Sequence, residues 1–352
     1  MTSVSVVLPC YNVESWIARC LDSLVNQTLR DIEIICVDDK STDNTLKILK
    51  DYAKRDKRIK LIEHKTNRGA AIARNNGLKR ATGDYVGFVD PDDYVDLDFY
   101  EKLYARAVKT NADVIKGMMV LKSASKPDRQ TLKRLHKLRH DIAWFNCEHC
   151  TAIYKRDFLK ENNITYPAHL RYSQDAAFVT SVALKAHSID LVTNAYYHYF
   201  FQRPGSLDSA VLSHAKAESK YNAFSFSLNE IEKADLTPKR RKLFLCAHVL
   251  DHIAYELSKT FEHESDKQKF FDLLVQINKH HNIKRALKHK FGGMELKCIQ
   301  RNNWHAFSTR GKFRIYLFRF LPLLRIEKCA GCTYVNLFEI IPILKIRNKL
   351  DY

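Results

Sequence analysis

The first ninety residues alternate between two hydrophobic periods. Short apolar runs of the buried-strand type occur at residues 4–8, 32–37, 59–64 and 85–90. Each of the first three is followed by a segment whose apolar residues recur at helical spacing. Alternating strands and helices predict a largely parallel sheet that is covered by helices on both faces. In such sheets, ligands bind beyond the carboxyl ends of the strands.

Polar residues follow each predicted strand at that edge. They are Pro9, Tyr11 and Asn12 after the first strand, Asp38, Asp39 and Asp43 after the second, Arg68 and Arg74 after the third, and an aspartate cluster from Asp90 onward after the fourth. Because these strand ends share one edge of the sheet, we expect the side chains to form a single site.

The aspartate cluster places five carboxylates in the nine positions from Asp90 to Asp98. Like charges this close repel one another, so a cation is expected to neutralise them. A calcium-binding EF-hand loop fails, because Val95 stands where that loop needs glycine and Tyr94 stands at a ligand position. An acidic loop without a ligand is the simpler alternative. Asp96 and Asp98 are expected to begin the next helix, whose dipole favours negative charge.

Composition describes an ordinary globular chain of two or three structural units. It has 352 residues, of which 45% are hydrophobic and 28% charged. No uncharged apolar run reaches 18 residues, so we expect no transmembrane helix. The chain starts without a basic leader, and its nine scattered cysteines fit a reducing compartment. These features predict a cytoplasmic protein.

The net charge of +18 is unevenly distributed. Residues 1–110 hold 18 basic against 17 acidic side chains, so nearly all the excess lies behind them. A neutral N-terminal part and a basic C-terminal part indicate a catalytic unit followed by a segment that faces an anionic partner.

Two common phosphate-binding motifs are missing from the sequence. No G-x-G-x-x-G follows the first strand, and no G-x-x-x-x-G-K-[ST] occurs anywhere. Without such a glycine loop, a diphosphate can instead be neutralised by a divalent cation held on carboxylates. The aspartate cluster is placed for that task.

Four motifs in order resemble those of family 2 glycosyltransferases with the GT-A fold. They are "VVLPCYNVESWIARCLDSLVNQT", "IEIICVDDKSTDNT", "NRGAAIARNNGLKRATGDYVGFVDPDD" and "SQDAAF", and the resemblance covers about residues 1–205. It implies an α/β, Rossmann-like GT-A domain with a nucleotide-sugar half at 1–110 and an acceptor half at 111–214. A basic, mainly helical region at 215–352 is expected to follow.

The resemblance also implies how a nucleotide-sugar, usually a UDP-sugar, is bound. Asp39 is expected to contact the base, Arg68 the base or phosphates, and Asp90 the ribose or donor sugar. Mn²⁺ or Mg²⁺ is expected on Asp92, with Asp93 close by. The donor-binding set is Pro9, Tyr11, Asn12, Asp39, Arg68, Asp90, Asp92 and Arg203, and the metal-binding set is Asp92, Asp93 and His198. The Tyr- and Phe-rich run around His198 and Arg203 equally fits a buried strand.

The base of an inverting transfer is expected at Asp175. Family members usually carry Glu-Asp at this place, whereas this chain has Gln174 followed by Asp175. A carboxylate opposite the leaving diphosphate takes the proton of the acceptor hydroxyl. Without a neighbouring carboxylate, Asp175 should release its proton more readily. The alternative is that Asp175 only caps a helix.

Two further motifs have weaker interpretations. "CEHC" at 147–150 suggests zinc together with His136 or His140, but the second Cys pair, Cys329 and Cys332, is far away in the sequence. We therefore expect these thiols to pack near the acceptor pocket. "QRNNW" at 300–304 differs from the Q-x-x-R-W signature of processive synthases, so we expect single sugars to be added.

The last segment contains an internal repeat. "LFRFLPLLRIE" at 317–327 and "LFEIIPILKIR" at 337–347 share a central proline and a basic residue before the last isoleucine. The repeats fit helices and turns packed on the catalytic domain, or attachment to an anionic membrane surface. No nucleic-acid-binding signature is present.

The predicted function is therefore metal-dependent, inverting transfer of one sugar. The donor is a nucleotide-sugar, and the acceptor is a lipid-linked or cell-surface glycan such as lipooligosaccharide, O-antigen or capsule, at the inner face of the membrane. The alternatives are a sugar-phosphate nucleotidyltransferase, or a basic membrane- or nucleic-acid-binding module with a vestigial site.

Overall fold

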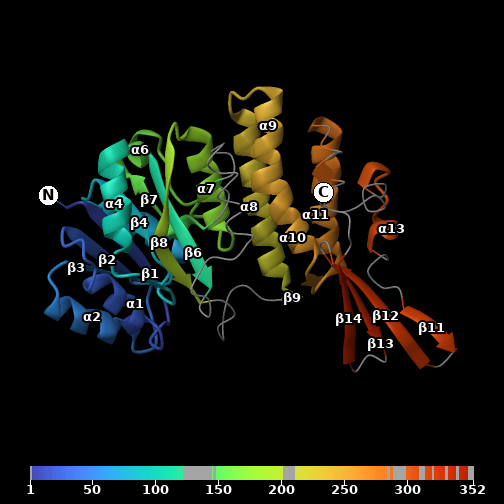
Figure 1. Cartoon of the computed structure of the whole chain (residues 1–352), viewed down its shortest axis with the longest axis horizontal. Coiled ribbons are helices and arrows are strands. Elements are labelled where there is room, and N and C mark those ends of the chain that lie inside the picture. Colours follow the sequence, from blue (N-terminus) through green and yellow to red (C-terminus); the bar gives the residue numbers. More distant parts are fainter. Residues whose placement is uncertain are drawn as a thin grey trace. The chain divides into compact units, whose positions relative to one another are not determined.

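A computed structural model describes residues 2–121, 145, 148–200, 211–281, 283, 286–287, 299–308 and, between 314 and 347, the backbone of four strands. The chain divides into two compact units (Figure 1). Unit 1 comprises Met1–Asp208 and Ser225–Asp235. Unit 2 comprises Ser209–Phe224 and Leu236–Tyr352.

Unit 1 is built on an eight-stranded sheet of order β3-β2-β1-β4-β7-β6-β8-β5. The four N-terminal strands are parallel, as predicted, and β8 runs parallel to β6, whereas β7 and β5 run antiparallel to their neighbours. The strands are β1 (Val4–Cys10), β2 (Ile32–Asp38), β3 (Ile59–Glu63), β4 (Tyr85–Phe88), β5 (Tyr94–Val95), β6 (Val114–Leu121), β7 (Ala152–Lys155) and β8 (Ile189–Tyr199).

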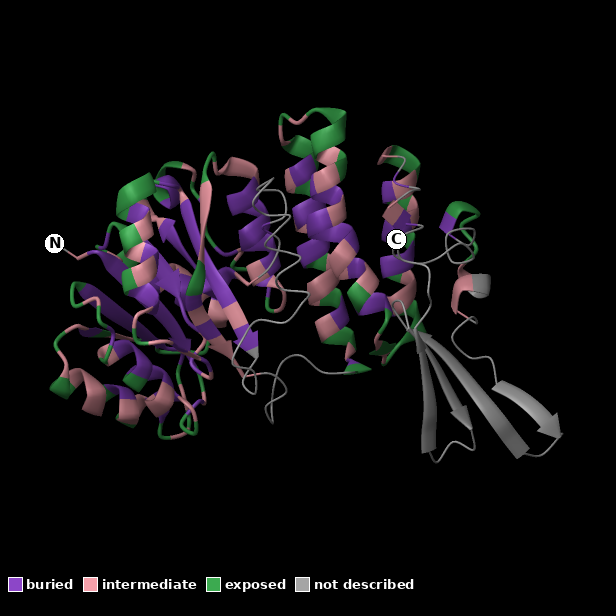
Figure 2. Cartoon of the chain, viewed as in Figure 1, coloured by how far each residue is buried: buried purple, intermediate pink, exposed green. Residues whose placement is uncertain are grey.

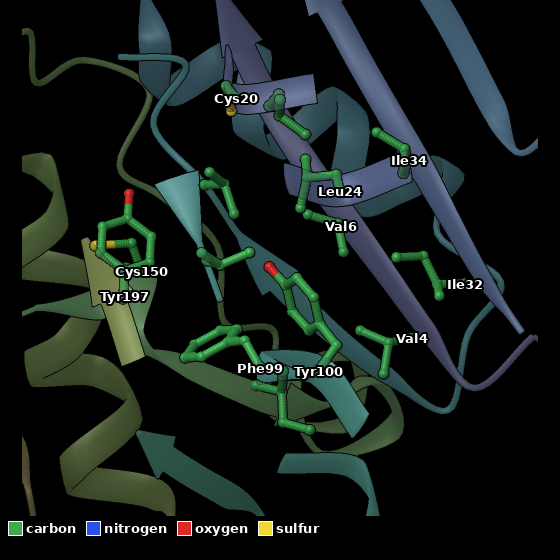
Figure 3. Packing of buried hydrophobic residues seen from close by; sticks show 14 of the residues in the cluster. Val4, Val6, Cys20, Leu24, Ile32, Ile34, Phe99, Tyr100, Cys150 and Tyr197 are labelled. Carbon is green, nitrogen blue, oxygen red and sulfur yellow. The ribbon is translucent and has the colours of Figure 1, made fainter. Parts of the chain in front are cut away.

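Helices cover both faces of this sheet, which confirms the α/β prediction. Alternate residues of β1 separate two cores: Val4 and Val6 pack with α1, α2 and α4, and Val7 packs against α3. Figure 2 shows that β1, β2 and β4 are buried along their whole length, and Figure 3 shows the first core closely. Phe88 turns to the second face, where it meets Phe178 of α7. The helices are α1 (Ile17–Val25), α2 (Thr45–Arg55), α3 (Ala70–Arg80), α4 (Phe99–Thr110), α6 (Arg156–Glu161) and α7 (Gln174–Lys185).

Glycine permits the close contact between α3 and β1. A Cβ atom at Gly77 would lie 2.3 Å from Cγ1 of Val7, far inside van der Waals contact. The third helix can therefore sit directly on the central strand, and the loop that precedes it reaches the carboxyl edge of the sheet.

Unit 2 is mostly helical, as expected. Its aromatic core includes Phe224, Phe244 and Phe270, and Thr237 caps α9 through its side chain while Pro238 occupies the first turn. None of the helices in the described ranges is long and apolar enough to cross a membrane. The elements are α8 (His214–Lys233, of which Ser225 onward belongs to unit 1), β9 (Val211–Leu212), α9 (Pro238–Leu245), the π-helix η3 (Cys246–Leu250), α10 (Asp251–Leu257), β10 (Thr260–Phe261), α11 (Glu264–His281) and α13 (Trp304–Ser308).

The repeated segments are strands, which corrects the expectation of helices and turns. The first repeat includes the end of one strand and most of the next, the second includes the end of one strand and the whole of the next, and the four strands form an antiparallel sheet. In both copies the strand register shifts next to the residue that pairs with the proline, which is Pro322 in the first copy and Pro342 in the second. Proline and β-branched residues disfavour a helix here. The strands are β11 (Arg314–Phe318), β12 (Leu321–Cys329), β13 (Cys332–Leu337) and β14 (Ile341–Arg347).

Candidate active site

The loops that follow β1 and β2 are bound to each other. Asn12 adopts a positive φ of 50°, and its side-chain oxygen accepts a hydrogen bond of 2.8 Å from the backbone N–H of Thr42. The backbone N–H of Val13 donates to Oγ1 of Thr45 over 2.8 Å. Pro9 is buried at the end of β1, whereas Tyr11 is 46% exposed. The two loops therefore form one rim, on which Tyr11 presents an accessible ring.

Asp39 organises the loop that leads into α3. Its carboxylate accepts hydrogen bonds from the backbone N–H groups of Arg68 (2.8 Å) and Gly69 (2.7 Å) and lies 2.7 Å from Nδ1 of His64. Asp39 is buried, whereas the side chain of Arg68 is exposed. The predicted contact of Asp39 with a base stays a prediction, and the structure adds a role in holding the Arg68 loop.

His64 is a member of the site that the sequence did not reveal. The Nδ2 amide of Asn76 lies 2.8 Å from Nε2 of His64, on the side opposite Asp39. An amide N–H only donates, so Nε2 accepts and Nδ1 carries the proton that binds Asp39. The buried imidazole thus connects the Asp39 carboxylate to helix α3.

Two protein groups hold the backbone of the "DPDD" loop in place. Nη2 of Arg19, on α1, donates to the carbonyl of Asp92 over 2.6 Å. The hydroxyl of Tyr197 accepts from the backbone N–H of Asp90 (3.2 Å) and donates to Oδ2 of Asp93 (2.6 Å). Neither Arg19 nor Tyr197 belongs to a motif of the loop itself, so sequence reasoning missed both.

The structure does not bring the three predicted metal ligands together. Asp93 is buried, and its second oxygen accepts a 2.8 Å hydrogen bond from the backbone N–H of Phe200. Burial, followed by the charges of Asp90 and Asp92, raises the pKa of Asp93 to about 8. Among the described residues no three His, Cys, Asp or Glu side chains are grouped as a metal site would need.

The imidazole of His198, on β8, contacts the side chains of Asp96 and Tyr94. Its Nε2 lies 2.7 Å from Oδ1 of Asp96, and its ring stacks on Tyr94 with the ring centroids 4.4 Å apart. Asp98, as expected, directly precedes α4, and it pairs with Lys102 over 2.7 Å. Arg203, predicted to bind the donor, lies outside the described residues.

The candidate base stands in the first turn of α7. Ser173 is the cap residue of this helix, so Asp175 does not cap it and that alternative falls. Gln174 is buried and Asp175 is half-buried. The side-chain amide of Gln174, the residue before Asp175, lies 3.0 Å from Nη1 of Arg74, whose Nη2 contacts Oδ1 of Asp90 over 2.6 Å. The structure therefore brings the candidate base and the aspartate cluster together around Arg74.

Three residues of the "CEHC" motif, Glu148, His149 and Cys150, contribute to the same region, whereas Cys147, His136 and His140 lie outside the described residues. Glu148 pairs with the buried Nζ of Lys116 over 3.0 Å, and Cys150 is a free, buried thiol. The ring of His149 lies 5.7 Å from that of Tyr166, and its buried Nε2 has no hydrogen-bond partner. Burial, and after it the charge of Arg74, lowers the pKa of His149 to about 4. His149 is thus a neutral imidazole behind the candidate site.

The sheet and its helices are of the GT-A type, as a solved structure shows. The structure of residues 1–349 of S. aureus TarS in complex with UDP-GlcNAc superposes with a TM-score of 0.69 at 23% identity, covering 97% of this chain and 98% of that one. The complex of the Pyrobaculum calidifontis mannosyltransferase PcManGT with GDP-Man and Mn²⁺ gives a TM-score of 0.55 at 16% identity, covering 87% of this chain and 86% of that one. At these identities the likeness shows the fold.

Sequence comparison then identifies the family. Residues 5–172 match the profile of "Glycosyl transferase family 2". The glycosyltransferase EpsJ of Bacillus subtilis, described as uncharacterized, is 30% identical over 309 residues, which are 81% of this chain and 86% of EpsJ. The chain belongs to glycosyl transferase family 2, which sets aside the nucleotidyltransferase alternative.

Another relative is considerably longer than this chain. The poly(ribitol-phosphate) beta-glucosyltransferase of Bacillus spizizenii is 32% identical over 279 residues, which are 76% of this chain. The chain spans only 43% of that relative's length.

The buried imidazole of His149 predicts acid sensitivity. In the unfolded chain a histidine takes up a proton below about pH 6.5, whereas folded His149 does so only near pH 4. Stability should therefore be lost as pH falls through this window, by roughly 2–4 kcal/mol. His149→Phe, which suits the aromatic surroundings, should flatten the pH dependence. Urea unfolding of both proteins between pH 7.5 and 4.5 checks this, and parallel curves would contradict it.

Proposed function

We propose that this glycosyltransferase transfers one sugar, with inversion, from a UDP-sugar to a hydroxyl of a cell-surface or lipid-linked glycan. The observation that carries the proposal is that Arg74 contacts both Asp90 and Gln174, the residue before Asp175, at the carboxyl edge of the parallel strands. An inverting transfer needs a carboxylate near the acceptor hydroxyl, on the face away from the departing diphosphate. The neighbouring Asp39 loop, with the exposed Arg68, supports a nucleotide on the same edge.

The relatives favour an anionic polyol-phosphate polymer as the acceptor. Besides the Bacillus glucosyltransferase, TarS of S. aureus, a poly(ribitol-phosphate) beta-N-acetylglucosaminyltransferase, is 29% identical over 269 residues. The net charge of +18 complements a polymer with a phosphate in each repeat, whereas lipooligosaccharide and O-antigen need not carry such charge. Incubation with UDP-glucose and UDP-N-acetylglucosamine, with and without poly(ribitol phosphate), tests the proposal. Absence of polymer-dependent UDP release with both donors would argue against it.

A divalent cation remains part of the proposal, with fewer protein ligands than expected. Asp92, in the middle of the "DPDD" run, is the carboxylate proposed to hold Mn²⁺ or Mg²⁺, whereas the oxygens of Asp93 and the Nε2 of His198 contact protein groups. Magnesium commonly binds through one or two carboxylates together with substrate phosphates. The cation would supply positive charge to the leaving diphosphate.

Replacement of Asp92 should therefore remove the metal dependence of nucleotide binding. Asp92→Ala is expected to bind UDP equally with and without Mn²⁺, because the cation loses the carboxylate that is proposed to hold it. Calorimetry of UDP binding with Mn²⁺ and with EDTA checks this. His198→Gln serves as the control and should keep the metal dependence. Metal-dependent binding that survives in Asp92→Ala would move the cation elsewhere.

Asp175→Asn should preserve the fold and UDP affinity while turnover falls. An amide has nearly the same shape but cannot accept the acceptor's proton, and positioned base catalysis contributes about 10²- to 10⁴-fold. Initial rates of transfer to poly(ribitol phosphate) check this, with Asp157→Asn on the surface helix α6 as the control. Near-normal turnover in Asp175→Asn would place the base at another residue.

An anionic membrane surface is the partner that we propose for the basic unit 2. The register of β11–β14 sorts their residues onto two faces. One face carries mainly aliphatic positions together with Lys328, and the other carries the larger share of the basic ones alongside Glu327. The aliphatic set includes Leu324, Ile326, Val335, Leu337 and Leu344, and the basic set includes Arg314, Arg325, Lys345 and Arg347. Because the sets lie on opposite faces, one flat surface contacts only one of them, and the basic set suits anionic headgroups.

Binding through basic residues should be fully reversible by salt. The chain should sediment with phosphatidylglycerol-containing vesicles at 0.1 M salt and be released at 1 M, because the Debye length falls from roughly 10 Å to 3 Å. Arg325→Glu combined with Lys345→Glu should weaken sedimentation. Lys79→Glu combined with Lys109→Glu, an equal charge change in unit 1, serves as the control. Absence of sedimentation at low salt would contradict the membrane proposal.

A further inference from the structure

Arg74 is a buried cation at the centre of the candidate site. It projects from α3, its side chain is 7% exposed, and its guanidinium lies 5.3 Å from the ring centroid of Tyr166. Burial alone would lower its pKa, but the carboxylate of Asp90, followed by other neighbours that include Asp175, raises it. A guanidinium in such a place stays charged, and hydrogen bonds from its two terminal nitrogens offset the cost of burial, since its buried Nε has no partner among the described residues.

Gln174 provides the second fixed partner. In the amide orientation that gives both polar atoms a partner, Oε1 of Gln174 accepts from Nη1 of Arg74 over 3.0 Å. Nε2 of Gln174 then donates to the carbonyl of Leu170 over 3.1 Å. Gln174 is only 8% exposed, so its side chain is confined between α3 and the loop that precedes α7.

One guanidinium therefore connects two parts of the chain that the sequence separates widely. Nη2 binds Asp90, just past the end of β4, and Nη1 binds Gln174, the first residue of α7. The planar guanidinium fixes the directions of both bonds at once. Asp175 is the next residue along the helix, so its backbone position depends on the same bridge.

We propose that Arg74 and Gln174 form a positioning bridge that sets the placement of the base Asp175 relative to Asp90. The inference rests on the proposed function, in which Asp90 faces the donor and Asp175 takes the acceptor's proton. The side-chain oxygen of Gln174 matters for this role, because it accepts from Nη1 while the carboxylate of Asp90 contacts Nη2. Neither residue of the bridge needs to touch the substrate.

A matched pair of substitutions at Gln174 tests the bridge. Gln174→Met keeps the length and bulk of the side chain but has no oxygen for Nη1, so kcat should fall by roughly 10- to 100-fold, the effect of a misplacement of about 1 Å. Gln174→Glu keeps an acceptor oxygen and should stay closer to wild type. UDP affinity should be unchanged in both. Transfer from UDP-glucose or UDP-N-acetylglucosamine to poly(ribitol phosphate) provides kcat, and calorimetry provides the affinity.

Coupling to Arg74 separates positioning from simple packing. Arg74→Lys retains the charge, but one ammonium group cannot satisfy both partners in the same geometry. If the two residues act through one bridge, the double variant Arg74→Lys with Gln174→Met should be no slower than Arg74→Lys alone. Arg106→Lys, which alters an ion pair of 2.7 Å with Asp190 in the same unit, is the control and should keep wild-type kcat.

Two results would overturn the bridge. One is a kcat of Gln174→Met equal to that of wild type. The other is a double variant whose fold-decrease in kcat equals the product of the fold-decreases of the two single variants. Thermal unfolding of wild type, Arg74→Lys, Gln174→Met and the double variant, all without substrate, measures the coupling independently of activity. Non-additive melting temperatures together with an inactive wild type would reject the proposed function and keep the contact, whereas additive melting temperatures would reject the contact itself.

Discussion

Carboxylates at the carboxyl edge of the sheet are stable only because protein groups bind them. Asp39 accepts hydrogen bonds from two backbone N–H groups and contacts His64. Asp90 is paired with Arg74. Asp93 accepts hydrogen bonds from the hydroxyl of Tyr197 and the backbone N–H of Phe200. Buried charges without such partners are costly, and charges this close also repel one another. The rest of the site follows from this constraint, because the binding groups fix the loops on which the exposed residues stand.

The parallel part of the fold could be predicted because every local signal agrees. The apolar runs of β1 to β4 and the amphipathic helices between them each have a period that suits one structure. Residues of the site that follow a strand, such as Asp39 and Asp90, could be found from their position. Residues that support them from other elements, such as Arg19, His64 and Tyr197, could not, since only the folded chain brings them near.

Two predictions illustrate why the remainder was harder. His198 lies beside the aspartates in the fold, as expected, but Asp96 competes for its ring nitrogen, and sequence spacing does not decide between such partners. The repeats in the tail have an apolar and basic pattern that suits a helix face as well as a strand. Their prolines and β-branched residues, weighted more strongly, would have favoured the strands that β11 to β14 form.

Stereochemistry offers the most direct measurement of the central claim, which is that Asp175 assists attack on the face of the sugar away from the departing diphosphate. In UDP-glucose and UDP-N-acetylglucosamine the sugar is joined through an α bond. Attack assisted from the side of Asp175 displaces the diphosphate from the other side, so the account predicts a β-linked product. Proton NMR of the anomeric signal after transfer to poly(ribitol phosphate) distinguishes the two configurations. A β-anomer supports this arrangement of the site, and an α-linked product would contradict it.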